Sequence, residues 1–180
     1  MKRVAVIGGC MGLFLILSPV YALSQQVNWL LGMRLGLSIA SGGPSVDIVN
    51  PFTGQKTHQG GTSAGFQFGP TGEVIFSKDL AIVEAFNINT QSGTPIEWQN
   101  TFKYYFSIPK SKIKPYADAG FSLWFFTGGP YVSIPFGGGA LFEVAPHVYI
   151  PADVQFGPIF VSGSTQFVIE ITTGIRYEFH

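Results

Sequence analysis

The chain has 180 residues, of which 46% are hydrophobic, 15% aromatic and only 11% charged, with a formal net charge of zero at pH 7. Soluble domains contain about 25% charged residues, and a disordered chain would lack the 17 Phe, 7 Tyr and 3 Trp found here. No run of roughly 18 apolar residues occurs, which excludes transmembrane helices, and the zero net charge gives no electrostatic basis for binding nucleic acid.

The first 24 residues have the pattern of a secretory signal. Two basic residues precede a 14-residue apolar stretch, Val4–Leu17, which is followed by small residues and two cleavage frames that end at Ala22 and Ser24. We expect residues 1–24 to be a cleaved Sec signal peptide and residues 25–180 to form an outer-membrane β-barrel. The alternative is an uncleaved anchor, for which the apolar stretch is short.

The single cysteine, Cys10, lies inside this segment. Lipidation at Cys10 is an alternative, but only six apolar residues precede it and the apolar stretch continues beyond it. Removal of the segment leaves no cysteine and therefore no disulfide. The exported protein then needs a packed core or a closed sheet for its stability.

The residues after the signal alternate in character. From Val27 to Ile39 every odd position is apolar, and the even positions are mostly small or polar. Such alternation places the two sets on opposite faces of a β-strand. The apolar face consists of Val27, Trp29, Leu31, Met33, Leu35, Leu37 and Ile39.

Six further segments alternate in the same way: Gly60–Phe76, Leu80–Thr90, Glu97–Ser107, Lys114–Phe126, Val132–Val144 and Val148–Phe160. One of them is ambiguous, because Glu84 falls on the same face as Leu80, Ile82, Phe86 and Ile88. A β-bulge there would turn Glu84 to the other face.

The last segment, residues 166–179, completes a set of eight predicted strands. Apolar and aromatic residues from Phe167 to Phe179 alternate with a face that carries Glu170, Arg176 and Glu178. Links between the strands are short at residues 77–79, 108–113 and 145–147. The one long link, loop 42–59, falls on the opposite side from the chain ends.

Three features favour a membrane barrel over a soluble sheet. Several strands reach 12 to 17 residues, whereas soluble strands have about five or six. In five of the eight strands the mid-strand charges lie on one face and the opposite face has none, and aromatic residues gather near both strand ends, as in interfacial girdles. We therefore predict an all-β, eight-stranded antiparallel up-and-down transmembrane β-barrel in the bacterial outer membrane. It closes because an open sheet edge is unfavourable in lipid.

The polar faces of the strands predict a charged lumen. We expect the inward charges to pair across it and to fill it as a structural plug, because an isolated buried charge is unfavourable. The alternative is a narrow, weakly cation-preferring passage. The predicted lumen charges are Arg34, Glu73, Glu97, Lys103, Asp118, Glu143, Asp153, Glu170, Arg176 and Glu178.

The sequence TTGIRYEF at residues 172–179 resembles the C-terminal β-signal of bacterial outer-membrane barrels, with Gly174, Tyr177 and Phe179 as its characteristic residues. KPYADAGFSL (114–123) and FGGGALFEV (136–144) are similar to small barrels of the OmpA/OmpX and opacity-protein kind. The resemblance implies recognition of the last strand by the barrel-assembly machinery. One departure is His180, which follows the usual terminal Phe.

Candidate chemical residues are sparse. His58 in the long loop, with Ser133 and Ser162 near the same rim, is the one arrangement that could support a lipid A-modifying enzyme. No His, Cys and Asp cluster has metal-ligand spacing, and no cofactor is expected. We predict a structural or surface-interaction protein without enzymatic activity. Its partners are outer-membrane lipid and lipopolysaccharide, with an extracellular ligand bound through loop 42–59. A narrow solute channel and a soluble lipocalin-like carrier are the alternatives.

Overall fold

The computed structural model describes residues 27–49, 56–91, 94–126, 129–161 and 164–179. The predicted signal peptide, residues 1–24, lies outside this part of the chain. The described strands are β1 (Asn28–Val49), β2 (Lys56–Ile75), β3 (Leu80–Asn89), β4 (Ile96–Tyr105), β5 (Ile113–Phe126), β6 (Gly129–Ser133), β7 (Phe136–Ala145), β8 (Val148–Val161) and β9 (Ser164–Phe179).

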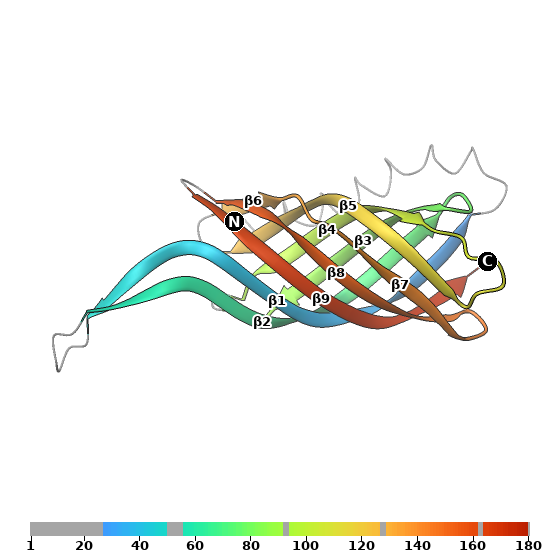
Figure 1. The fold of residues 1–180 in the computed structure, drawn as a ribbon, viewed down its shortest axis with the longest axis horizontal. Helices are drawn as coiled ribbons and strands as arrows, with labels where there is room; N and C mark the ends of the chain where they lie inside the picture. Colours follow the sequence, from blue (N-terminus) through green and yellow to red (C-terminus); the bar gives the residue numbers. More distant parts are fainter. Residues whose placement is uncertain (1–26, 50–55, 92–93, 127–128, 162–163, 180) are drawn as a thin grey trace, which may run out of the picture.

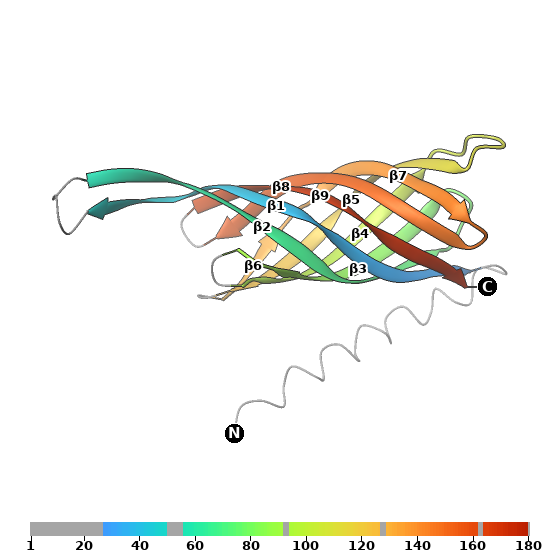
Figure 2. The same cartoon turned by 90° about the horizontal axis from the view of Figure 1, so that it is seen from below.

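These strands form one closed antiparallel sheet (Figures 1 and 2). Strands that follow one another in the chain pair, except β6 and β7, and β9 pairs with β1 from Trp29↔Phe179 to Ser41↔Phe167. β6 and β7 together make one side of the barrel, because both pair with β5 and with β8. The predicted eight-stranded up-and-down barrel is therefore confirmed. Within the described residues, no helix is long and apolar enough to cross a membrane.

The strand predicted over Val132–Val144 is interrupted once, between β6 and β7. Pro135 has no backbone N–H to donate, and the residues beside it bond irregularly. The Ile134 N–H donates to the Pro158 carbonyl at 3.2 Å, and the Gly120 N–H donates to the Pro135 carbonyl at 2.9 Å. The wall of the barrel is therefore hydrogen-bonded through the interruption.

The strands carry their apolar side chains on the outside of the barrel and polar ones inside. Leu31, Leu35, Phe156 and Ile171 are 51%, 55%, 46% and 50% exposed. A soluble carrier would require polar residues at these four positions. The distribution is the reverse of a soluble protein and fits a surface in contact with lipid.

The prediction of a long loop at residues 42–59 is wrong. β1 continues to Val49 and β2 begins at Lys56, so the two strands extend past the barrel as a paired hairpin (Figure 1). The register shifts between Ala40 and Gly43 and again between Gly43 and Val46. These irregularities interrupt the period-two pattern, which is why the sequence suggested a loop.

The β-bulge that would have turned Glu84 to the inner face is absent from the pairing of β3 with β4. The register of β3 on β4 runs without a shift from Leu80↔Tyr104 to Ile88↔Ile96. Glu84 therefore stays on the outer face. Its carboxylate accepts a hydrogen bond from the Trp98 indole N–H at 2.9 Å. This bond replaces one of the hydrogen bonds to water that the carboxylate loses on the lipid-facing surface.

Candidate functional site: the lumen and its two ends

The barrel has two distinct ends. β1 begins and β9 finishes at one of them, which we call the terminal end, and the β1–β2 hairpin projects from the other, the hairpin end (Figure 2). Between them the inward-facing side chains fill the lumen in layers. The layer nearer the terminal end is the inner ion cluster, which comprises Glu73, Lys103, Tyr105, Tyr116, Asp153 and Arg176. The layer nearer the hairpin is the outer polar cluster, which comprises Arg34, Gln99, Asp118, Gln155 and Glu170.

Glu73 connects three strands of the inner ion cluster. Its side chain is fully buried, and its carboxylate accepts hydrogen bonds from the Arg176 guanidinium and the Tyr105 hydroxyl. The Nζ atom of Lys103 lies 3.9 Å from Glu73 Oε2. Two cations and one hydroxyl therefore surround a carboxylate that has no access to bulk water, which is the condition under which a buried charge is tolerated.

Asp153 is the second carboxylate of this cluster. Its Oδ1 atom lies 3.6 Å from Lys103 Nζ and accepts a hydrogen bond from the Tyr116 hydroxyl. Lys103 Nζ also lies 3.7 Å from the centre of the Tyr116 ring, as in a cation–π contact. Lys103 thus connects β2, β5 and β8 through one buried ammonium group.

The outer polar cluster is organised around Arg34. Its Nη2 atom forms an ion pair with Glu170 Oε2 at 3.1 Å and donates to Gln155 Oε1 at 3.3 Å, and Nη1 donates to Gln99 Oε1. Gln99 Nε2 donates to Gln155 Oε1 at 2.8 Å, and Gln155 Nε2 donates to Asp118 Oδ2 at 3.0 Å. The side-chain amides of Gln99 and Gln155 therefore link Arg34 to Asp118 through hydrogen bonds.

Acidic groups outnumber cations in the described lumen. The buried carboxyls are Glu73, Glu97, Asp118, Asp153, Glu170 and Glu178, against the buried cations Arg34, Lys103 and Arg176. The excess lies towards the hairpin end, where Glu97 accepts a hydrogen bond from the Asn87 amide at 2.7 Å. An unpaired buried carboxylate is unfavourable, so the buried acids in this half of the lumen depend on hydrogen bonds from neutral side chains such as the Asn87 amide.

An apolar floor closes the lumen at the terminal end. Leu30, Ala81, Leu141 and Tyr149 are buried together and pack with Tyr105 and Tyr116 of the inner ion cluster. These packed apolar side chains separate the inner ion cluster from the water at the terminal end.

The two remaining predicted lumen charges lie beside this floor. Glu178 accepts hydrogen bonds from the Asn28 amide at 2.8 Å and the Tyr149 hydroxyl at 2.7 Å. Glu143, on β7, is only half-buried. Glu178 therefore belongs to a polar rim at the terminal end, and neither group joins the two clusters described above.

The neutral partners in these clusters were not recognised from the sequence. Tyr105 and Tyr116 donate hydrogen bonds to the two inner carboxylates. Gln155 donates to the carboxylate of Asp118, and Gln99 connects Gln155 to Arg34. Alternation was the available signal, because Tyr105 follows Lys103 by two positions and Tyr116 precedes Asp118 by two. Their pairing depends on the relative height of distant strands, which alternation does not specify.

The three residues of the predicted assembly signal lie on β9. Gly174 pairs with Arg34, and a Cβ atom at this position would lie 2.1 Å from the Met33 carbonyl oxygen. Tyr177 and Phe179 are exposed on the outer face, with ring centres 4.8 Å apart. The close approach of β1 and β9 therefore requires glycine at position 174, independently of any role in assembly.

The residues considered for catalysis are not brought together in the described part of the chain. Ser133 is buried in β6 near the hairpin end, and the backbone of His58 pairs with Asp47 in the hairpin. His147 lies in the turn between β7 and β8, at the terminal end, and Ser162 lies outside the described residues. Among the described residues, no group of three His, Cys, Asp or Glu side chains could hold a metal ion.

A closed barrel with an apolar exterior and a charged interior is the arrangement of a transmembrane β-barrel. Eight strands are enough for the side chains alone to fill the lumen. The fold therefore places the protein in the class of small bacterial outer-membrane barrels, and its location is the outer membrane.

Solved structures support this class. Neisserial surface protein A is 16% identical, with a TM-score of 0.61, over 86% of this chain and 100% of that one. The N-terminal barrel domain of Pseudomonas aeruginosa OprF is 10% identical, with a TM-score of 0.58, over 86% and 98% of the two chains. Neither a protein-family model nor a curated protein sequence matches the chain. At these identities the likeness concerns the fold alone.

Proposed function

We propose that the protein is a structural and surface-interaction barrel of the outer membrane that binds a protein partner through its β1–β2 hairpin. The hairpin end faces outside and the terminal end faces the periplasm. Residues 1–24 direct export, and the barrel-assembly machinery recognises β9 through Gly174, Tyr177 and Phe179. Lipid and lipopolysaccharide surround the apolar exterior.

The observation that carries the proposal is the pair of free strand edges on the hairpin. β9 accompanies β1 only as far as Ser41, and the pairing of β3 with β2 reaches only Gln67. Thr90 and Gln91 extend these contacts to Phe66 and Ser63. After Ser41 on β1, and before Ser63 on β2, the described residues of the hairpin pair only with each other. Exposed strand edges bind extended segments of other proteins by strand addition.

The filled lumen supports a role other than transport. The inner ion cluster crosses the barrel from β4 to β8, where Lys103 Nζ lies 3.6 Å from Asp153 Oδ1, and the apolar floor lies beneath it. A passing solute would have to displace buried ion pairs, which is unfavourable.

A second candidate function, a narrow passage for small cations, is favoured by the excess of buried carboxyls in the outer half of the lumen. Rings of acidic side chains are typical of cation-selective pores. The apolar floor opposes this function, because it blocks the continuation of such a path.

Two measurements test the proposal. Folded protein in planar bilayers should show no steady single-channel conductance, whereas discrete cation-selective openings would support the second function. Cells that produce the barrel with residues 43–60 replaced by a tight turn should lose adhesion to matrix proteins and to neighbouring cells. A hairpin of the same composition in scrambled order serves as the control. Unchanged adhesion with the short turn would contradict a role for the hairpin.

A further inference from the structure

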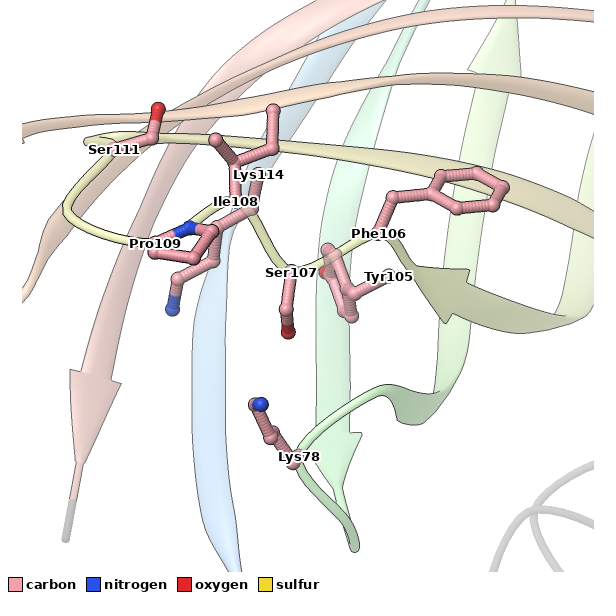
Figure 3. A pocket seen from close by; sticks show the side chains of 8 residues that line it. All are labelled: Lys78, Tyr105, Phe106, Ser107, Ile108, Pro109, Ser111 and Lys114. Carbon is pink, nitrogen blue, oxygen red and sulfur yellow. The ribbon is translucent and has the colours of Figure 1, made fainter.

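A pocket of about 400 Å³ opens at the terminal end, and Tyr105 of the inner ion cluster forms part of its wall (Figure 3). Lys78 reaches it from the β2–β3 turn, and the connection after β4 contributes Phe106, Ser107 and Ile108. Lys114, at the start of β5, lines another side of the pocket, and its Nζ atom also lies 5.2 Å from the centre of the Tyr149 ring. Figure 3 shows the ammonium groups of Lys78 and Lys114 reaching towards the open space beneath this connection. The pocket therefore presents two cations from separate segments.

This sector of the barrel is strongly basic. Outside the predicted signal peptide the chain has eight Lys and Arg residues. Four of them lie in these two connections or at the start of β5, namely Lys78, Lys110, Lys112 and Lys114. None of the four forms an ion pair with a carboxylate in the described part of the protein. The acidic neighbours are Asp79, whose Oδ1 atom accepts a hydrogen bond from Ser107 Oγ at 2.6 Å, and Glu143, whose backbone N–H donates to the Lys112 carbonyl at 2.9 Å. A net positive charge therefore remains at the mouth of the pocket.

The same pocket has an apolar flank. Phe106 and Ile108 are 50% and 51% exposed, and the ring of Phe106 lies 5.3 Å from that of Tyr104 on the outer face of β4. Aromatic rings at the end of a barrel strand mark the boundary between hydrocarbon and head groups. The lysines thus lie at head-group level, with apolar side chains on the membrane side.

We propose that this pocket binds an anionic phospholipid of the periplasmic leaflet, with the phosphate between Lys78 and Lys114 and the acyl chains along Phe106 and Ile108. Basic pockets at the membrane surface recognise anionic head groups in this way. A soluble phosphate or an acidic peptide would use the lysines but would leave the apolar flank exposed to water. The proposal relies on the terminal end facing the periplasm, whereas binding itself can be measured without regard to orientation.

The test is lipid binding to the folded protein in a neutral maltoside detergent, followed by native mass spectrometry. Phosphatidylglycerol should bind at least tenfold more tightly than phosphatidylcholine. Since each lysine near an anionic surface is worth about a fivefold change in affinity, Lys78→Gln with Lys114→Gln should weaken binding by about 25-fold. The matched control is Lys110→Gln with Lys112→Gln, which removes the same charge from residues that do not line the pocket. It should weaken binding by less than about fivefold.

Three results would overturn the proposal. Equal losses in the two double variants would mean that only net charge matters. Equal binding of phosphatidylcholine would remove the anionic specificity, and displacement of the lipid by inorganic phosphate or a peptidoglycan fragment would identify a site for a soluble anion. Each variant must still migrate faster unboiled than boiled on a gel, so that misfolding is not mistaken for lost binding.

Discussion

Replacement of Arg176 by Met should destabilise the barrel by about 3–5 kcal/mol, which is the usual cost of removing one partner from a buried ion pair. Arg176 donates a charge-assisted hydrogen bond to Glu73, worth about 1.5–3 kcal/mol by itself. Its loss leaves Glu73 and Asp153 with one shared cation, Lys103, at 3.9 and 3.6 Å. Methionine keeps most of the volume, so the loss reports on charge more than on a cavity.

The assay is urea unfolding of protein refolded into lipid vesicles, followed by tryptophan fluorescence and by the gel shift between unboiled and boiled samples. Glu73→Gln in the Arg176→Met background should recover part of the loss, because the unpaired carboxylate is then removed. The double-mutant cycle should give a coupling energy of about 2 kcal/mol. A single-variant loss below about 1 kcal/mol, or additive effects within about 0.5 kcal/mol, would refute the assignment of a buried pair.

Three further variants test other parts of the barrel. Glu84→Leu should stabilise the protein by about 1–2 kcal/mol in urea unfolding, because it removes a carboxylate from the lipid-facing surface; a loss of stability would mean that the Trp98 contact outweighs desolvation. Gly174→Ala should slow or prevent refolding, since its Cβ would lie 2.1 Å from a backbone oxygen, whereas the control Gly72→Ala meets only a flexible leucine carbon at 3.3 Å. Equal refolding yields would contradict this. Leu35→Arg with Ile171→Arg should cost about 2–4 kcal/mol per arginine and abolish membrane assembly, and normal heat-modifiable protein in the outer membrane would disprove the lipid-facing assignment.

The alternation of side chains was enough to predict the barrel wall. From Leu31 to Ile39 one face meets lipid and the other a polar lumen, so every second residue carries a clear signal. The signal fails beyond Ala40, where two register shifts and the positive φ of Gly42 (93°) break the period. Without the period-two pattern, the sequence of this hairpin cannot be distinguished from that of a loop.

The contacts inside the lumen could be predicted only in part. The inward face of β9 followed from alternation, but the pairing of Arg34 with Glu170 joins residues 136 positions apart. That pairing depends on strand tilt and on the stagger with which the sheet closes. Glu84 shows the opposite difficulty, because a single hydrogen bond from Trp98 lets a carboxylate remain on a face that the pattern reserves for apolar residues.

The way in which Arg34 is bonded has a kinetic consequence. Its partners Gln99, Gln155 and Glu170 belong to β4, β8 and β9, at sequence separations of 65, 121 and 136 residues. The bonds to Gln155 and Glu170 can form only after the first and last strands have met, which is late in folding because such distant contacts are slow to form. Interactions absent from the transition state act mainly on the unfolding rate. The outer polar cluster should therefore lengthen the lifetime of the folded barrel while leaving its rate of folding almost unchanged.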